Sequence, residues 1–460
     1  MIRIYIDWNV MSHMKAGGHA EFSKIVRNDE KFFKVYSTSH ISDIAASDQG
    51  ELNRKNVESD LAFIADLTKG CCACNVKNEI AFEDRSPLQM YDERTDLNDI
   101  QQIFTPEGIE KILEDLGPEV AALARPYIDA FKNLPVDSVF KEAFENPETA
   151  AQMRQFLPDL ENNYTMAGVF NALLQMFNRL NENDDYKHLR ITLQKGVEIN
   201  RDRLYDAKDP QGMINKAYQK KGIVLPETPY DDKNAPKWFN ELVNEYLRLD
   251  MHGYQEDKVE VGKKGRKQTF RNTMEDAFHT AFATTCDFYI TKDDRNYKKA
   301  EVVYEKLGIN SLVMEPQEFV DHYKNWLHFE KEKSSMLIAG LLKRHKYEIS
   351  EDGKKQIYFG HFFIFDYFNK IYFYNQSEIY LVLSREKPTH ARQVFENELS
   401  RLIDKLLTLF GEDIDGLGSL RSEEISLARE DRWAGRKWLH NGLNYNLKLV
   451  HGHLQLYLTG

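Results

Sequence analysis

The sequence predicts an α/β protein whose parallel sheet is interrupted by a large helical insertion and followed by an α+β domain. Two short segments, IRIYID near the start and DFYIT near residue 290, have the β-branched and aromatic residues of buried strands. Helical patterns alternate with these strands, and this alternation favours a parallel sheet with right-handed crossovers. The long segment between them has helical periodicity, and the segment after residue 329 is rich in aromatic strands.

The first part of the chain, residues 1–95, begins this α/β pattern. VYSTSHISDIAA predicts a strand end that leads into a helix, with Ser39 as its N-cap. Residues 51–68 then have apolar side chains at helical spacing, and Gly70 follows as a stop signal. CCACNV is expected to form a second short strand.

The middle of the chain, residues 96–261, is predicted to be a helical insertion. TPEGIEKILEDLG has a proline at its first helical position and a glycine beyond its end, and MAGVFNALLQMFNRL is the most apolar of these helices. Residues 262–328 then return to the α/β pattern, with NTMEDAFHTAFATTC as a helix and NSLVM as a strand. We therefore predict that residues 262–328 complete one domain with residues 1–95.

The last part, residues 329–460, is predicted to be an α+β domain. Residues 357–384 are rich in aromatic residues at the spacing of β-strands. An amphipathic helix follows and ends at Gly411, and LNYNLKLVHGHLQLYL is typical of a closing hairpin. The aromatic side chains of residues 357–384 fit the packing of a sheet, with base stacking as the alternative.

The composition is that of an ordinary globular protein, with 42% hydrophobic and 29% charged residues among 460. No apolar run approaches the roughly 20 residues of a membrane helix, so we expect no membrane partner and no signal peptide. Four cysteines, three of them clustered, make a poor disulfide framework and favour the reducing cytoplasm. A net charge of −12 argues against DNA packaging, so nucleic-acid binding would need a local basic patch and metal ions.

Four carboxylates lie at strand ends or near helix N-termini, where an α/β fold exposes side chains, and they are candidate metal ligands. Asp7 ends the first strand, where a buried carboxylate needs a cation, hydrogen-bond donors or a shifted pKa. Asp293 follows the strand DFYIT, and Asp43 and Asp276 lie near helix N-termini. Ligands bind beyond the carboxyl ends of parallel strands, and oxygen-only ligand sets suit Mg²⁺ or Mn²⁺. Two such ions can activate a water and stabilise the leaving oxygen in phosphodiester hydrolysis.

Four segments resemble the PIN-domain nuclease superfamily, over about residues 1–95 and 270–325: YIDWNV, SHISDI, EDAFHTAFATTCDFYITKDDRNYKKA and VMEPQEF. The family has D-x-N after its first strand, an acid on an early helix, an Asp that opens a later helix, and T-x-D after the following strand. The resemblance implies a Rossmann-like parallel sheet and metal-dependent cleavage of RNA or, in some members, of DNA.

The resemblance also implies roles for individual residues. The catalytic, metal-binding acids would be Asp7, Asp43, Asp276 and Asp293. Asn9 would orient Asp7 or contact the substrate, and Thr291 would hydrogen-bond a water on the metal. The sequence departs from the family at two points. Asp43 stands where the family usually has Glu, and the tandem acids Asp293 and Asp294 leave open which of them binds the metal.

Each of the later acids also has a structural alternative. Asp276 fits a helix start with Thr273 as the N-cap, and Asp43 fits a first-turn acid that complements the helix dipole. Asp293 and Asp294 fit turn residues. If the extended conformation persists after the strand, the T-x-D spacing selects Asp293 for the metal and leaves Asp294 as the N-cap of the next helix.

Two further features lie close to these acids in the sequence. The segment GKKGRKQTFR contains no acid, and it either grips phosphates near the site or forms a solvated loop. Its candidate substrate-binding residues are Lys263, Lys264, Arg266 and Lys267. His279, three residues after Asp276 on the same helix, either assists the acids or is structural.

These observations predict a metal-dependent endonuclease with Mg²⁺ or Mn²⁺ as its cofactor, and RNA is favoured over DNA as its substrate. The insertion is far larger than cleavage needs, so we expect the extra domains to select the substrate or to hold the nuclease in check, as in toxins or antiphage defence effectors. A homo-oligomer or a regulatory protein partner is compatible with this role. Two alternatives stay open: a structure-specific DNA nuclease whose insertion clamps a strand, and a non-catalytic binding or scaffold protein with a salt-bridged Asp7.

Overall fold

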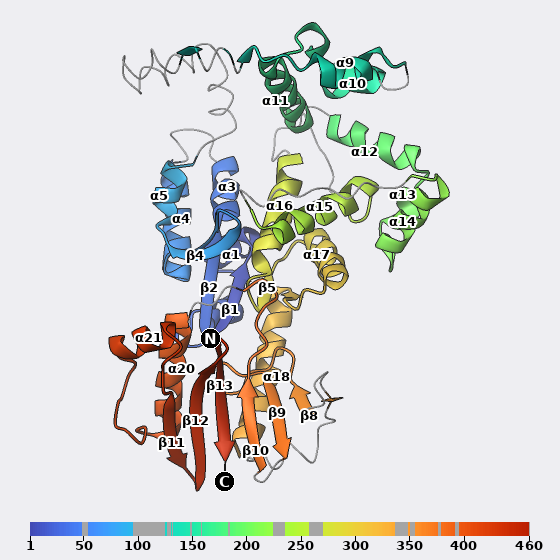
Figure 1. Cartoon of the computed structure of the whole chain (residues 1–460). Helices are drawn as coiled ribbons and strands as arrows, with labels where there is room; N and C mark the ends of the chain where they lie inside the picture. The colour runs from blue at the N-terminus through green and yellow to red at the C-terminus, as the bar shows by residue number, and fades with distance from the viewer. Residues whose placement is uncertain are drawn as a thin grey trace. The chain divides into compact units, whose positions relative to one another are not determined.

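The structure is a computed structural model of the chain, whose helices and strands are labelled in Figure 1. The chain falls into two compact units. The described residues are 1–47, 54–94, 125–126, 130, 132–147, 150–157, 159–182, 185–223, 235–256, 270–335, 348–349, 355–375, 379–391 and 395–459. Unit 1 comprises Met1–Gln89, Thr228–Tyr246 and Asp276–Gly460, and unit 2 comprises Met90–Glu227 and Leu247–Glu275. The division into three domains stays a prediction, because the compact units group both sheets of the protein in unit 1.

The first sheet of unit 1 is a mostly parallel six-stranded sheet in the order β4-β3-β2-β1-β5-β6. Its strands are β1 (Ile2–Ile6), β2 (Phe32–Ser37), β3 (Cys71–Val76), β4 (Glu79–Asp84), β5 (Phe288–Ile290) and β6 (Leu312–Met314). The central strand β1 pairs in parallel with both β2 and β5, and all five of its residues are buried. Only β4 runs antiparallel, at one edge, and the sequence did not predict this strand. The α/β class and the parallel core are as predicted.

Among the described residues up to 335, several helices lie wholly or partly in unit 1. They are α1 (Trp8–Lys15), α2 (Ala20–Val26), α3 (Thr38–Ser47), α4 (Arg54–Thr68), α5 (Pro87–Asp92), α15 (Lys237–His252), α16 (Phe270–Ala283), α17 (Asp294–Leu307) and α18 (Pro316–Ser335). The prediction of Ser39 as an N-cap is wrong, because α3 already begins at Thr38 and the Ser39 N–H donates to Ser37 Oγ at 3.3 Å. The cap alternative for Asp276 is also wrong, since α16 includes Phe270 and both Thr273 and Asp276 lie inside the helix.

The second sheet of unit 1 is antiparallel and has seven strands in the order β11-β12-β13-β10-β9-β8-β7. Its strands are β7 (Glu348–Ile349), β8 (Lys355–Tyr358), β9 (Lys370–Asn375), β10 (Ile379–Ser384), β11 (Arg436–His440), β12 (Leu443–Val450) and β13 (His453–Thr459). The amphipathic helix α20 (Phe395–Phe410) packs its apolar face against this sheet, and α21 (Ser422–Arg429) follows. The aromatic strands, the helix and the β12–β13 hairpin confirm the predicted elements.

A buried ionic network within unit 1 joins the first sheet to α20 and to the segment that follows β10. The Arg3 guanidinium on β1 pairs with Glu398 of α20 at 2.7 Å, and Arg385, which follows β10, pairs with Asp287 at 2.7 Å. The Arg3 backbone N–H also donates to Asp287 Oδ2 at 2.7 Å. Arg3 and Asp287 lie at the amino ends of β1 and β5, so the network lies at the opposite end of the first sheet from the candidate site.

The described elements of unit 2 that lie between residues 137 and 220 are helical. They are α9 (Asp137–Glu145), α10 (Ala150–Phe156), the short helix η2 (Leu160–Asn162), α11 (Met166–Glu182), α12 (Asp185–Gly196), α13 (Arg201–Leu204) and α14 (Pro210–Lys220). The buried Asp250 carboxylate accepts hydrogen bonds from Tyr186 at 2.6 Å and from Arg190 at 3.0 Å. The segment TPEGIEKILEDLG lies outside the described residues. Among the helices that are described, none is long and apolar enough to cross a membrane.

Candidate metal centre

Asp7 lies where β1 ends and α1 begins, at the carboxyl end of the parallel sheet. Its backbone N–H donates to the Ile290 carbonyl at 2.9 Å, which joins the ends of β1 and β5. Its side chain is the N-cap of α1 and accepts from the Asn9 N–H. Because the strand is buried on both sides, only 3% of Asp7 is exposed.

Asn9 and Thr291 hold the Asp7 carboxylate in one orientation. Asn9 Nδ2 donates to Asp7 Oδ2 at 2.9 Å, and Thr291 Oγ1 donates to the same oxygen at 2.8 Å. The Lys292 N–H donates to Asn9 Oδ1 at 3.3 Å. These donors carry no charge, and no Lys or Arg among the described residues forms an ion pair with Asp7. The salt bridge that would favour a scaffold role is therefore not found in the described part of the chain.

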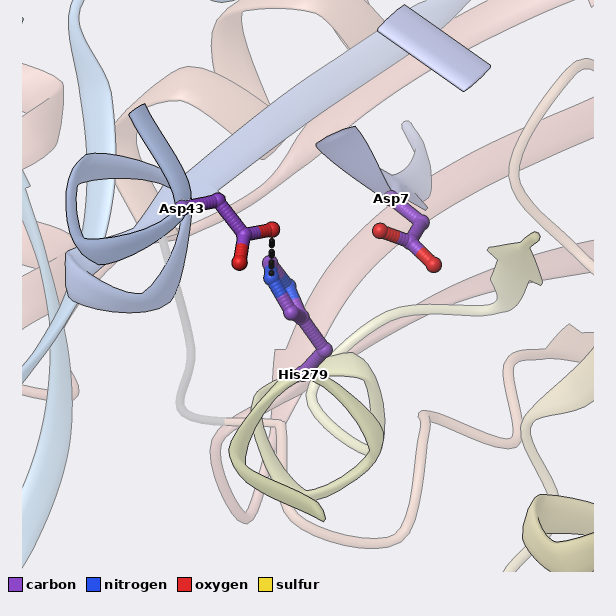
Figure 2. Close-up of side chains that lie close together, drawn as sticks. All are labelled: Asp7, Asp43 and His279. Carbon is purple, nitrogen blue, oxygen red and sulfur yellow. Dashed lines mark hydrogen bonds and ion pairs between the residues drawn. The ribbon is translucent and has the colours of Figure 1, made fainter. Parts of the chain in front are cut away.

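Asp43 and His279 face Asp7 from two helices (Figure 2). Asp43 on α3 keeps 30% of its side chain exposed, whereas His279 on α16 is 1% exposed. Asp43 Oδ2 lies 3.1 Å from His279 Nε2. One ligand atom from each of Asp7, Asp43 and His279 lies within 4.8 Å of the other two. Two carboxylates and an imidazole that converge in this way form a donor set that can hold one divalent cation.

A chain of buried polar groups contacts His279 at Nδ1, the ring nitrogen that does not face Asp43. The Tyr5 hydroxyl lies 2.7 Å from His279 Nδ1 and 2.6 Å from Ser37 Oγ. Burial raises the pKa of Tyr5 well above its ordinary value, so the phenol keeps its proton. Burial also lowers the pKa of His40, whose Nδ1 lies 3.4 Å from the same hydroxyl, so that His40 is neutral. The His279 ring is thus fixed with Nε2 directed toward the acids.

The electrostatics of Asp7 favour a cation beside it. Burial raises the pKa of Asp7 above its ordinary value, and the nearby Asp43 charge raises it further. His279 and the hydrogen bonds from Thr291 and Asn9 lower it but do not cancel the burial. A carboxylate that is costly to ionise in the metal-free protein is stabilised when a divalent cation replaces its lost hydration. The residues present therefore fit a metal ion.

The structure does not bring Asp276 and Asp293 into this group of three. Asp276 lies one turn before His279 on α16, and its charge contributes, after burial, to raising the pKa of Tyr289. Asp293 is the N-cap of α17 and accepts from the Arg295 and Asn296 N–H groups at 2.9 and 3.0 Å.

The prediction that Asp294 caps α17 is wrong, and Asp293 has that role. Asp293 is the last extended residue, with φ −83° and ψ 106°, and the helix begins at Asp294. Asp294 is exposed and pairs with Lys298 on the next turn at 3.2 Å. Asp293 therefore has a structural role as a cap, and its N–H also donates to Thr291 Oγ1 at 3.2 Å beside the site.

Sequence patterns alone gave His279 no definite role, and they gave Tyr5 none. His279 follows the candidate acid Asp276 by three residues, and this spacing was the only indication in the sequence that His279 belongs to the site. Tyr5 stands in the apolar run IRIYID, where it has the appearance of a core residue. The basic candidates Lys263, Lys264, Arg266 and Lys267 lie outside the described residues.

The comparison with known proteins gives no relative that would assign this centre a role. No family model matches the chain, and neither a curated protein nor a solved structure matches it. The resemblance to PIN domains therefore stays a prediction from the four sequence segments, and the geometry of Asp7, Asp43 and His279 is the basis for a functional proposal.

Proposed function

We propose that this protein is a metal-dependent phosphodiester hydrolase, and that its substrate is RNA. The observation that carries the proposal is the convergence of Asp7, Asp43 and His279 at the carboxyl end of the parallel sheet. In open α/β sheets this end is where ligands bind, because loops and helix N-termini leave a crevice there. The order of the acidic segments in the sequence supports the same chemistry.

The residues of the chain would prepare the site before any ion or substrate arrives. Asp7 is already oriented by Asn9 and Thr291, so little side-chain entropy is lost when its carboxylate engages a cation. The partly exposed Asp43 lies on the solvent side of the centre, where a phosphate can approach. A bound divalent cation would supply Lewis-acid polarisation of the phosphate and a water of lowered pKa.

The basic segment and the extra parts of the chain fit a regulated nuclease. Phosphate contacts from Lys263, Lys264, Arg266 and Lys267 would position the nucleic-acid backbone despite the net charge of −12. Helices of unit 2 and the antiparallel sheet exceed what hydrolysis requires, and we propose that they select the substrate or restrain the nuclease. A cytoplasmic toxin or defence effector is the role that this combination favours.

The experiment is an incubation of the full-length protein with single-stranded RNA and single-stranded DNA in Mn²⁺, Mg²⁺ or EDTA. We expect cleavage of RNA that requires the divalent ion and is lost in Asp7→Asn and in Asp43→Asn. The matched control is Asp66→Asn, since Asp66 is an exposed acid paired with Arg27 and a surface pair of this kind contributes little. Cleavage that persists in both site variants would refute the proposed centre, and cleavage of DNA alone would move the proposal to a DNA nuclease.

A further inference from the structure

We propose that His279 is a direct nitrogen ligand of the metal centre, that Tyr5 is its positioning residue, and that the centre therefore prefers Mn²⁺ to Mg²⁺. This inference rests on the proposed function, since it concerns the same centre. It departs from the oxygen-only ligand set that the sequence predicts. It is carried by the geometry around the two ring nitrogens of His279.

Both ring nitrogens of His279 have a fixed partner. Nε2 lies 3.1 Å from Asp43 Oδ2, and Nδ1 lies 2.7 Å from the Tyr5 hydroxyl. A carboxylate oxygen only accepts hydrogen bonds from an N–H group, so in the metal-free protein Nε2 carries a proton that it donates to Asp43. The ring is almost completely buried, and its Nε2 is directed at the Asp43 carboxylate (Figure 2).

His40 fixes the direction of the neighbouring hydrogen bonds. Its Nε2 lies 2.8 Å from the Ile6 carbonyl, which only accepts, so this nitrogen carries the proton. Its Nδ1 then accepts from the Ser37 N–H at 3.0 Å. His40 is therefore neutral with both nitrogens bonded, and its Nδ1 lies 3.4 Å from the Tyr5 hydroxyl, farther than the 2.7 Å between that hydroxyl and His279 Nδ1.

The Tyr5 hydroxyl allows His279 to change its tautomer without leaving a buried group unsatisfied. It lies between His279 Nδ1 at 2.7 Å and Ser37 Oγ at 2.6 Å, and a hydroxyl both donates and accepts. When the ring proton is on Nδ1, His279 donates to Tyr5, Tyr5 donates to Ser37, and the Nε2 lone pair is free to bind a cation. This arrangement, in which a ligating histidine donates its other N–H to a fixed acceptor, is common at metal sites.

A nitrogen ligand changes which ion the centre prefers. Carboxylate and water ligands suit Mg²⁺ and Mn²⁺ alike, but imidazole binds transition ions better than it binds Mg²⁺. Two carboxylates with one imidazole therefore favour Mn²⁺ over Mg²⁺. The alternative is that His279 only hydrogen-bonds to Asp43 and that the ion is coordinated by oxygen atoms alone.

The test uses full-length protein loaded with Mn²⁺ and measured by pulsed EPR, which detects a coordinated nitrogen through its modulation of the electron spin echo. We expect nitrogen modulation in the wild-type protein and its loss in His279→Gln. Glutamine reaches about as far as Nε2 but offers an amide oxygen, so the ratio of Mn²⁺ to Mg²⁺ affinity should fall by about tenfold or more.

Tyr5→Phe tests the positioning role. The variant keeps the ring but removes the hydroxyl, and we expect the nitrogen modulation to remain while Mn²⁺ affinity falls by about 10–100-fold. Tyr289→Phe is the matched control, since Tyr289 is equally buried, packs against Tyr5 and hydrogen-bonds to Asn296 instead. Its Mn²⁺ affinity should be unchanged.

The outcomes separate this inference from the proposed function. Mn²⁺ that binds at the acids without nitrogen modulation in the wild-type protein would overturn the role of His279 and leave the proposed hydrolase intact. A protein that binds neither Mn²⁺ nor Mg²⁺ would overturn both. Unchanged Mn²⁺ affinity in Tyr5→Phe would overturn the positioning role alone.

Discussion

Thr291 donates a hydrogen bond of 2.8 Å to the carboxylate of Asp7, a residue 284 positions away in the sequence. The bond joins the carboxyl ends of β1 and β5 at the candidate centre. Thr291→Val keeps the shape of the side chain but removes the donor to a buried carboxylate. We expect a loss of stability of about 1–3 kcal/mol and a weaker affinity for Mn²⁺, measured by urea unfolding and by calorimetric titration.

The control for this variant is Thr285→Val. Thr285 is also buried, and its hydroxyl donates to the Phe282 carbonyl at 2.7 Å, away from Asp7. It should lose stability without losing Mn²⁺ affinity. Equal Mn²⁺ affinity in the two variants would mean that Thr291 does not orient a metal ligand.

Asp7→Asn is expected to stabilise the metal-free protein at neutral pH while it abolishes cleavage. Burial raises the pKa of Asp7, so its carboxyl binds a proton more tightly in the folded chain than in the unfolded chain. The stability of the wild-type protein in EDTA should therefore fall as the pH rises from the ordinary value of 3.8 through the raised pKa. The free energy of unfolding, measured by denaturation at several pH values, should change less with pH for Asp7→Asn than for the wild-type protein. An equal pH dependence would contradict the raised pKa of Asp7.

Replacing Asp293 should destabilise the protein more than replacing Asp294. The sequence spacing, which made Asp294 the cap, predicts the reverse. Asp293→Ala removes the N-cap of α17 and should cost about 0.5–2 kcal/mol, whereas Asp294→Ala, on the exposed surface, should cost less than about 0.5 kcal/mol. Thermal unfolding of both variants checks this.

Asp293→Asn distinguishes a role of Asp293 as a helix cap from a role in metal binding and cleavage. Asparagine caps as well as aspartate, so stability should be retained. If Asp293 acts only as a cap, cleavage should also be retained. An inactive but stable Asp293→Asn would instead place this carboxylate among the metal ligands, as the PIN-domain resemblance implies.

Glu398→Gln should destabilise the whole of unit 1. Burial alone would raise the pKa of Glu398, but the charges of Arg3 and Arg385 lower it from 4.5 to about 2. Removing the charge leaves buried cations undercompensated, at a cost of about 3–5 kcal/mol. In the wild-type protein the ionised Glu398 contributes stability above pH 4.5 that is lost as the pH falls toward about 2, and acid unfolding of the variant should lack this contribution.

Replacement of Lys263, Lys264, Arg266 and Lys267 by Ala tests the basic segment. If these residues bind phosphates, binding of single-stranded RNA should weaken, and the slope of log affinity against log salt should fall by about one unit for each phosphate that is no longer neutralised. Turnover at saturating RNA should change less, because the metal ligands are intact. A salt slope equal to that of the wild-type protein would assign the segment to solvent.

The sequence determined those features that depend on neighbours along the chain. The β-branched run of β1, the amphipathic face of α20 and the alternation of strands and helices were sufficient to predict an α/β sheet and a later α+β region. The position of Asp7 at a strand end was equally local, and its need for compensation followed from burial. Such features are set by periodicity and turn chemistry, which are properties of short windows of sequence.

Only the tertiary structure decided which of these side chains meet. Asp43 and His279 are 236 residues apart, and they come together because α3 and α16 place both side chains at the end of β1. Asp293 became the N-cap of α17 and is not among the three grouped ligands. The pairing of Arg3 with Glu398 likewise joined β1 of the first sheet to α20, which packs on the second sheet. Pairings of this kind depend on how whole elements pack, and no local pattern records that packing.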